Sequence, residues 1–488
     1  MQSHPHFSAI DKSLVERIID EACVVLEKTG VIVEDEVARN TLSEAGLRIN
    51  PSSRKTYFSR ACVEKCLETA PSTIELYDRD GNPAAQLAGQ RLHFTPGSAA
   101  LEILDVNART PRKPATRDLV QFARLTQHLE HLAIQSTALV PADVPEKIAD
   151  RYRLYIALQV CELPIVSGTF TPEGFKSMKN MLVVIRGGNE NLRRKPLAIF
   201  DCCPTSPLKW SAHGCHDLIQ CARSGIPAEL VSMPLAGATA PVTLPGILVQ
   251  HTSENLSGLV IHQLTSPGSP VIWGGSPTIF DMRFGTTPMG SIEAMMLASG
   301  TAAIGKHLGL PTHGYLCLSD SKHVDVQAGF ESGMGALFAA LSGLNVIAGP
   351  GMLSFQTCQS LEKLVIDNEI CGACLRLQRG IEMHEPSIAN DLMGDIHHAE
   401  HFLTSPNTLR WMRDEFFTPS DIIDRYPSFA PDQKSILERA HAKGQSILSN
   451  EPVPALENEL RDELERMMLA DAKKAGMVKL PDLRIDEQ

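Results

Sequence analysis

Short apolar segments alternate with helical patterns through the middle of the chain. Most segments follow a turn or helix-stop signal such as Gly225-Ile226-Pro227 or Lys195-Pro196. Strands that alternate with helices indicate a parallel sheet covered by helices. Eight such units in roughly 270 residues match a closed (β/α)8 TIM barrel, which usually has about 250 residues, better than two doubly wound domains. The segments are Leu92–Phe94, Leu132–Ile134, Ile165–Ser167, Leu197–Phe200, Leu230–Ser232, Val271–Trp273, His313–Leu316 and Asn345–Ala348.

Two helical regions flank the predicted barrel, which we assign to residues 90–383. Residues 1–89 are predicted to hold helices and one β-hairpin, because Asp80-Gly81 lies between two apolar runs. Ser13–Glu16 has the form of a capping box and marks the start of the first helix. Residues 384–488 are predicted to form a C-terminal helical region that packs on the barrel.

Composition and charge exclude several classes of protein. The net charge of -12 and the absence of a Lys/Arg stripe argue against a nucleic-acid partner. No apolar run approaches the length of about 20 residues that spans a bilayer, and the N-terminus lacks a secretory signal. The 12 cysteines are scattered, some at apolar helical positions such as Cys23 and Cys66, as in a reducing compartment. We therefore expect a cytoplasmic protein.

The motif search finds few signatures of known chemistry. The chain has no P-loop, no nucleophile elbow and no His-Glu-x-x-His sequence. Cys371 and Cys374 have C-x-x-C spacing, but they lie in an apolar helical stretch, which favours a structural role. His397 and His401 are four residues apart and share a helical face, but no third ligand is specified, so no metal site is assigned.

Aromatic and acidic residues collect where the predicted strands end, at the positions that carry the chemistry in this fold. Only 5% of the chain is aromatic, so this placement is informative. Ring faces around one cavity attract a quaternary ammonium, which has no N–H to donate. The alternative, that each ring packs in the core, stays open for every one of them. The residues in question are Phe94, Phe170, Phe200, Asp201, Trp273, Tyr315 and Phe355.

Several runs in the second half of the chain resemble the trimethylamine methyltransferase family. The most specific are Ser319–Lys322 and Asp325–Glu331, and the resemblance covers the barrel and the C-terminal helices. Other runs that resemble the family are Thr287–Glu293, Gly309–Gly314, Gly349–Met352, Asp367–Glu369, His401–Leu403 and Pro419–Arg425.

The resemblance implies a barrel enzyme that moves a methyl group from a methylated amine to the cobalt of a separate corrinoid protein. The trimethylamine-specific members carry pyrrolysine in or near strand seven, whereas this chain has ordinary residues from Gly314 to Asp320. It is therefore similar to the branch without pyrrolysine, some of whose members demethylate quaternary amines such as glycine betaine. The cobalamin would belong to the partner protein, and no tightly bound cofactor is expected in this chain.

A quaternary amine already has a neutral tertiary amine as its leaving group, so the enzyme mainly has to align nitrogen, methyl and cobalt. The predicted substrate site consists of rings around the cation, an acidic group to balance its charge, and a donor for a betaine carboxylate. The residues assigned to these three roles are Phe94, Phe170, Trp273, Tyr315 and Phe355, then Asp201 or Glu331, and then His313 or Gln356.

Two other functions and the oligomeric state stay open from the sequence. A metal-dependent lyase or hydrolase would need His313, His323 and the histidines from His397 to His401 to converge. A protein that binds a quaternary amine without turning it over would keep the pocket and lose the reaction. The sequence does not identify the particular amine, the partner or whether the chain forms a homo-oligomer.

Overall fold

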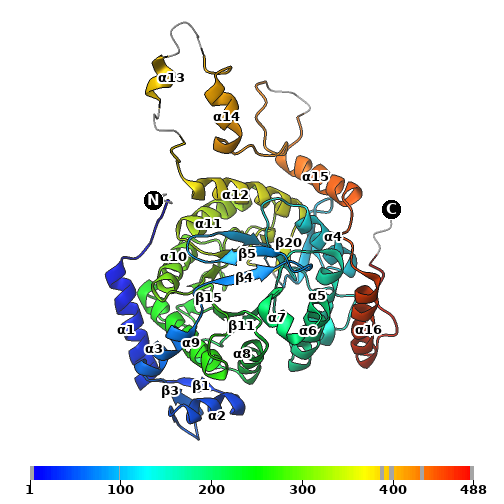
Figure 1. Cartoon of the computed structure of the whole chain (residues 1–488). Coiled ribbons are helices and arrows are strands. Elements are labelled where there is room, and N and C mark those ends of the chain that lie inside the picture. Colours follow the sequence, from blue (N-terminus) through cyan, green and yellow to red (C-terminus); the bar gives the residue numbers. More distant parts are fainter. Residues whose placement is uncertain (1–4, 98, 385–388, 395–400, 429–432, 484–488) are drawn as a thin grey trace.

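The structure is a computed structural model, and it describes residues 5–97, 99–384, 389–394, 401–428 and 433–483. Eight short parallel strands lie at its centre and helices surround them (Figure 1). The strands are β6 (His93–Thr95), β9 (Gln135–Ser136), β10 (Ile165–Ser167), β11 (Ala198–Cys202), β13 (Ala228–Ser232), β15 (Val271–Gly275), β17 (His313–Gly314) and β18 (Val346–Ala348). The α/β fold expected from the alternation is confirmed.

The eight strands pair as two parallel sheets, in the orders β15-β13-β11-β10-β9 and β17-β18-β6. Closure into a single barrel sheet, which the sequence predicted, is not observed among the described residues. Single contacts join the two sheets instead: Trp273 N donates to Pro311 O over 2.8 Å, and Ala133 N donates to Phe94 O over 3.2 Å. The two sheets meet between β15 and β17 and between β6 and β9. Of these strands, β6, β9 and β17 have only two or three residues, which leaves little length for a ladder of hydrogen bonds between the sheets. The second strand also lies later than predicted, because the chain still turns at Leu132.

The helices between the strands begin at capping residues. Ser211, Ser291, Asp325 and Ser360 each accept a hydrogen bond from a backbone N–H in the first turn. The helices are α4 (Thr116–Gln127), η1 (Glu146–Ile148), α5 (Ala149–Val160), α6 (Pro172–Arg186), α7 (Asn189–Arg194), α8 (Ala212–Ser224), α9 (Leu244–Thr265), α10 (Ile292–His307), α11 (Val326–Leu341) and α12 (Leu361–Arg379).

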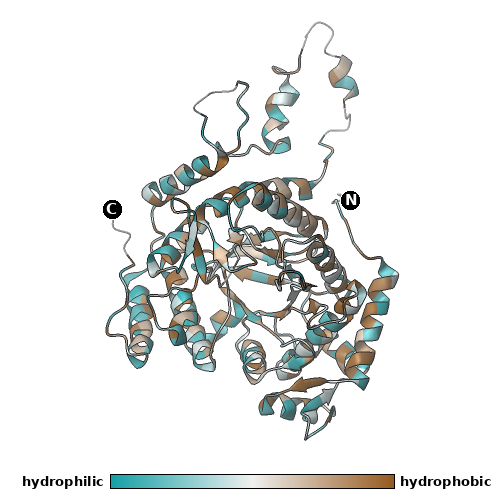
Figure 2. Ribbon diagram, turned by 180° about the vertical axis from the view of Figure 1, so that it is seen from behind, coloured by the Kyte–Doolittle hydropathy of each residue, from teal (hydrophilic) through white to brown (hydrophobic). Residues whose placement is uncertain are grey.

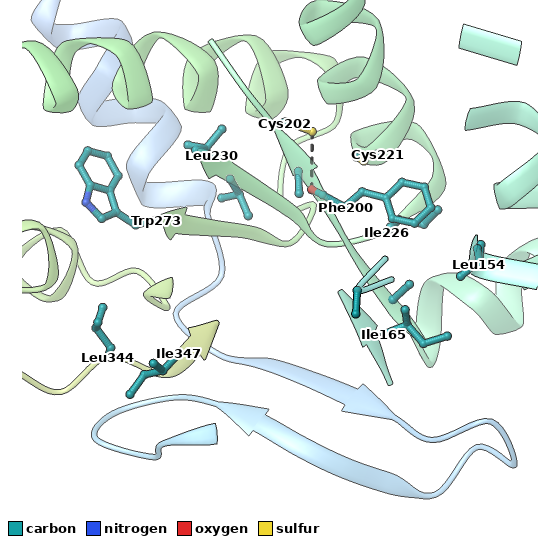
Figure 3. Close-up of a cluster of buried hydrophobic side chains, with 14 of the residues drawn as sticks. Leu154, Ile165, Phe200, Cys202, Cys221, Ile226, Leu230, Trp273, Leu344 and Ile347 are labelled. Carbon is teal, nitrogen blue, oxygen red and sulfur yellow. Dashed lines mark hydrogen bonds between the residues drawn. The ribbon is translucent and has the colours of Figure 1, made fainter. Parts of the chain in front are cut away.

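Alternate residues of each central strand face opposite sides. Phe200, Leu230 and Trp273 face outward and belong to the large core between strands and helices, part of which Figure 3 shows. Ile199 and Ile272 face inward, where they meet β4 (Ile74–Tyr77) and β5 (Pro83–Leu87). These two strands form the predicted antiparallel hairpin. The hairpin therefore covers the end of the central strands at which they begin.

The N-terminal region packs on the outside of α9. Its elements are α1 (Lys12–Lys28), β1 (Val31–Val33), α2 (Glu36–Glu44), β2 (Arg48–Ile49), β3 (Lys55–Tyr57) and α3 (Arg60–Thr69), and β12 (Lys209–Trp210) joins their sheet. The first helix starts earlier than predicted. Asp11, rather than Ser13, is its N-cap, because the Asp11 carboxylate accepts from Leu14 N over 2.8 Å.

We call the C-terminal end of the central strands the mouth. Short strands lie beyond this end and form its rim. They are β7 (Glu102–Asp105), β8 (Thr110–Arg112), β14 (Leu235–Ala236), β16 (Thr278–Ile279), β19 (Met352–Leu353) and β20 (Cys358–Gln359).

The C-terminal helices differ in how they contact the body. The helix α15 (Ile436–Asn450) packs on α12 and α4, and α16 (Asn458–Lys474) packs on α5 and α6. The helices α13 (Asn390–Gly394) and α14 (Pro406–Glu415) project away from the body (Figure 1). None of the described helices is both long and apolar enough to cross a membrane. The domain boundaries near residues 89 and 383 stay predictions.

Candidate functional site

Four polar side chains meet inside the ring of central strands. Asp201 on β11 is the register partner of Glu229 on β13, and Glu229 is the partner of the inward-facing Ile272. Registered neighbours in a parallel sheet face the same side, so both carboxylates point inward. His313 on β17 pairs with the inward-facing Val346, and Tyr315 follows two residues later on the same side.

The four side chains contact one another closely. His313 Nδ1 lies against Glu229 Oε2, and both side chains are fully buried. The rings of His313 and Tyr315 stack with centroids 5.0 Å apart and planes 18° apart. Glu229 also lies against Gly274 of β15, where an added Cβ would be 2.3 Å from Glu229 Oε1. Glycine at this position therefore makes room for the carboxylate.

Burial dominates the electrostatics of the site. Burial raises the pKa of Glu229 to about 8 and raises the pKa of Asp201 well above its usual value, to which the negative charge of Glu229 contributes. Burial also lowers the pKa of His313 to about 4, so its imidazole is neutral at pH 7. The free site therefore favours neutral carboxyl groups until a cation balances them.

Several polar atoms of this site have no hydrogen-bond partner among the described residues. They are Asp201 Oδ1, Glu229 Oε1 and His313 Nε2, whereas Glu229 Oε2 and His313 Nδ1 face each other. Buried polar groups in proteins are normally satisfied by protein or water, and leaving one unpaired costs roughly 1–3 kcal/mol. A cluster of unsatisfied atoms in one place is the signature of a binding site.

A buried arginine lies beside the acidic pair. Arg153 on α5 is 1% exposed and donates from Nε to Thr137 O over 2.9 Å. Its positive charge lowers the pKa of Asp201, although burial and Glu229 raise it more. Its guanidinium also lies 5.2 Å from the ring centroid of Phe170, which is 42% exposed. Phe170 therefore lies at the surface of the mouth, next to a cation.

Side chains become more exposed toward the mouth. Along the inner face of β11, Ile199 is fully buried, Asp201 is partly exposed and Cys203 is exposed. On the same side of β13, Glu229 is buried, and Met233, directly after the strand, is 38% exposed. The acidic pair therefore lies below the end of the strands at which the side chains become exposed.

Two of the predicted rings face the helices instead of the interior. Phe94 is the register partner of Ile347, on the opposite side from the inward-facing Val346. Trp273 follows the inward-facing Ile272; its ring lies 5.8 Å from His251, and a Cβ on Gly305 of α10 would touch it. The alternation of side chains along a strand decides both cases, so these rings do not face the acidic pair.

The remaining predicted residues lie in a separate loop cluster. The Lys322 ammonium lies 3.7 Å from the ring centroid of Phe355, and Ser354, Phe355 and Gln356 all have left-handed backbone. Glu331 Oε2 accepts from the Ser319 hydroxyl over 2.6 Å and from Asp320 N over 2.8 Å. Glu331 therefore holds the loop after β17 in place. The structure thus unites Asp201, His313 and Tyr315 of the predicted set.

Glu229 was missed in the sequence, although a signal was present. It is the only charged residue between Arg223 and Asn255 apart from Glu254, and it lies inside an apolar strand. A charge inside a buried strand needs a reason, which here is the site.

Metal binding has no support in the part of the chain that the structure describes. No three His, Cys, Asp or Glu side chains of those residues come together as metal ligands. Of the suggested histidine cluster, His397 and His398 lie outside the described residues. Cys371 and Cys374 are free, buried thiols on α12, in keeping with a structural role.

Comparisons with known proteins give a consistent result. The family model described as Trimethylamine methyltransferase (MTTB) matches residues 1–477. The chain is 31% identical to the trimethylamine methyltransferase MttB of Desulfitobacterium hafniense (strain DSM 10664 / DCB-2) over 88% of each chain. It is 29% identical to the glycine betaine methyltransferase of Desulfitobacterium hafniense (strain Y51), over 97% of this chain and 98% of the other.

A solved structure shares the fold. The monomethylamine methyltransferase (MtmB) of Methanosarcina barkeri superposes with a TM-score of 0.50 at 10% identity, and covers 92% of this chain and 90% of its own.

Proposed function

This chain belongs to the trimethylamine methyltransferase family, and from this premise we propose that it is a cytoplasmic enzyme that transfers a methyl group from a quaternary amine to a corrinoid protein. The donor is glycine betaine or a similar betaine, and the acceptor is the Co(I) of a cobalamin carried by a cognate partner. The similarity to a glycine betaine methyltransferase over nearly the whole chain supports the choice of donor.

One observation carries the proposal: the inward-facing pair Asp201 and Glu229 has unsatisfied oxygens toward the C-terminal ends of the central strands. A quaternary ammonium offers no N–H, so only opposite charge and ring faces attract it. Asp201 and Glu229 supply the charge, and the Tyr315 ring lies beside them. The carboxylates of Asp201 and Glu229 need no hydrogen-bond donor on the substrate, because they interact with the fixed positive charge of the methylated nitrogen.

The reaction needs no proton transfer. The electron pair of Co(I) forms the cobalt–carbon bond, the carbon–nitrogen bond breaks, and its electron pair stays on nitrogen as a neutral tertiary amine. The chain has to hold the nitrogen at the acidic pair and point one methyl group toward the mouth, which is catalysis by orientation. Because the nitrogen of the product no longer carries a fixed positive charge and the carboxylate remains, the product loses its attraction to Asp201 and Glu229 and leaves.

The rim supports access by a protein partner. Val242 and Met282 are each 70% exposed and Phe284 is 76% exposed, on the loops that follow β14 and β16. Val242 and Met282 both lie near Gly237, so the two loops approach each other. Exposed apolar side chains around an open mouth are what a docking protein uses.

A methyl-transfer assay tests the proposal. Purified chain is mixed with chemically reduced Co(I) cobalamin and one donor from a panel of glycine betaine, other betaines and trimethylamine. We expect the visible spectrum to change from Co(I) to methyl-Co(III) with a betaine and not with trimethylamine. Calorimetric binding is measured in parallel. Tight betaine binding without methylation by any donor would show a binding protein instead, and methylation from trimethylamine alone would contradict the choice of substrate.

A further inference from the structure

The guanidinium of Arg153 is a buried charge that forms no ion pair with a carboxylate of the described residues. Every residue of α5 is buried, and Arg153 is 1% exposed. Hydrophobic residues (brown in Figure 2) run through the helices around the central strands. Burial lowers the pKa of Arg153 to about 10, which still leaves it positively charged at pH 7. Buried charges in proteins are normally paired, so Arg153 calls for an anion that the described residues do not supply.

One nitrogen of this guanidinium is open to a further acceptor. Nε donates to Thr137 O over 2.9 Å, and Nη2 donates to Thr137 O and, over 2.8 Å, to Thr137 Oγ1. Nη1 has no hydrogen bond to any described residue. Unlike Asp201 Oδ1 and Glu229 Oε1, Nη1 is not fully enclosed, so it borders open space. Thr137 therefore fixes one edge of the guanidinium and leaves the other edge available.

Arg153 and the acidic pair lie at the same end of the strands. Thr137 directly follows β9, and Asp201 lies one residue before the end of β11. Burial dominates both pKa values, but each charge also acts on the other: Asp201 raises the pKa of Arg153, and Arg153 lowers the pKa of Asp201. The partly exposed ring of Phe170 lies 5.2 Å from the guanidinium, so Arg153 lies just below the mouth.

The two donors that the sequence suggested for a substrate carboxylate are less suitable. His313 is neutral at pH 7 and lies against Glu229, at the position of the ammonium group. Gln356 belongs to the separate loop cluster around Lys322 and Phe355. Arg153 is charged at every pH at which proteins are normally studied, and charge-assisted hydrogen bonds to carboxylates are the stronger ones.

We propose that Nη1 of Arg153 binds the carboxylate of the substrate, and that this contact restricts the site to zwitterionic quaternary amines. The inference rests on the proposed function, because it places the ammonium group at Asp201 and Glu229. A betaine supplies a positive nitrogen for the acidic pair and a carboxylate for Arg153. A quaternary amine without a carboxylate would satisfy the acidic pair, leave Arg153 uncompensated and be repelled by it.

Calorimetric titration with two matched ligands tests the proposal. Glycine betaine and choline share the trimethylammonium group, but choline has a neutral hydroxyl in place of the carboxylate. We expect the wild type to bind glycine betaine at least about 100-fold more tightly, because choline leaves a buried charge unpaired. Arg153→Gln should weaken glycine betaine binding by about 100-fold and leave choline binding equal or tighter. The preference between the two ligands should therefore disappear.

Two further variants separate charge from structure. Arg153→Lys keeps the positive charge without the planar fork, so it should retain a preference of about tenfold for glycine betaine. Arg124→Gln is the matched control, because Arg124 on α4 is a partly buried arginine that donates to the carbonyls of Leu448 and Glu451, away from the mouth. It should keep the full preference. Circular dichroism follows the fold of each variant.

The result that would overturn the proposal is a wild type that binds choline as tightly as glycine betaine. An Arg153→Gln variant that loses affinity for both ligands in equal proportion would also overturn it, because a purely structural role has that effect. Methyl transfer to Co(I) cobalamin is measured separately. Arg153-dependent betaine binding without transfer would support the carboxylate site and contradict the proposed activity, whereas equal transfer from betaine and choline would do the reverse.

Discussion

Two groups of buried charges differ in how their polar atoms are satisfied. Lys363 and Asp367, one turn apart on α12, are each 1% exposed. Lys363 Nζ donates to Asp367 Oδ2 over 2.5 Å and to Ser332 Oγ over 2.7 Å, and Gly351 N donates to the same carboxylate over 2.7 Å. Asp201 and Glu229 are two acidic groups side by side, and Asp201 Oδ1 and Glu229 Oε1 lack partners among the described residues.

The contrast teaches that a buried charge does not mark a functional site by itself. The α12 pair is neutral as a pair and joins α12 to α11 and to the loop after β18, which is a structural task. The acidic pair is held in an unfavourable state that a cation relieves.

Asp367→Ala should lower the free energy of unfolding by about 3–5 kcal/mol, because it leaves the Lys363 ammonium buried without its counter-charge. Urea denaturation followed by circular dichroism measures the loss. Glu21→Ala, which removes an exposed ion pair with Arg17, serves as the control and should leave the midpoint unchanged. A stable Asp367→Ala protein would show that the α12 pair is dispensable for the fold.

Glu229→Gln should do the opposite, with a large loss of activity and no loss of stability. Removing one carboxylate from the acidic pair should lower kcat/KM for the betaine by roughly 100- to 1,000-fold, the size of effect seen when one preorganised electrostatic group is removed. The unfolding midpoint at pH 7 should stay nearly the same, because the raised pKa keeps Glu229 mostly protonated in the free protein and glutamine has the same size. Full activity in this variant would remove Glu229 from the site.

Gly274→Ala should weaken betaine binding by roughly tenfold or more, since overpacking costs about 1–3 kcal/mol. Its Cβ would stand 2.3 Å from Glu229 Oε1 and push the carboxylate aside. Gly168→Ala, directly after β10, is the matched control, because the new Cβ would lie 3.6 Å from Asp201 Cβ, an ordinary contact. Calorimetric titration compares the two variants, and equal affinities would show that the position of the Glu229 carboxylate does not matter.

The pH dependence should be the smallest effect, at most tenfold in affinity per pH unit for one proton. The pKa of Glu229 is raised to about 8 in the free protein, so below this pH the cation must displace a proton. Betaine binding should therefore tighten as the pH rises from 6 to about 8 and then level off. For the same reason stability should fall as the pH rises from the unfolded-state value of about 4.3 toward 8.

Glu229→Gln is the control for this profile and should flatten both slopes. Titration in two buffers with different ionisation enthalpies gives the number of protons released on binding. Release of no proton by the wild type near pH 7 would contradict the raised pKa.

Much of the fold could be predicted from local patterns. The alternation of apolar segments and helices identified all eight central strands to within a few residues, and Asp80-Gly81 identified the hairpin. These signals depend on neighbours in the chain. Closure into one sheet did not follow, because whether two short strands pair depends on contacts between distant segments.

The candidate site was predicted only in part. Asp201 was chosen because it follows a predicted strand, His313 as a donor and Tyr315 as a ring in the seventh predicted segment, and the three do meet. Phe94 and Trp273 were chosen as rings at the ends of predicted strands, but each stands one position away from an inward-facing residue. A shift of one residue along a strand exchanges the two faces, and the sequence does not show which face points inward.

The family, the order of strands and helices, and the kinds of side chain near the mouth could be read from the amino-acid sequence, because they depend on residue type and short spacing. Only the tertiary structure decided that Glu229 stands opposite Asp201, that Trp273 packs on α10, and that Lys363 satisfies Asp367. Those outcomes depend on the register between strands and on packing between segments far apart in the chain, which local patterns do not encode.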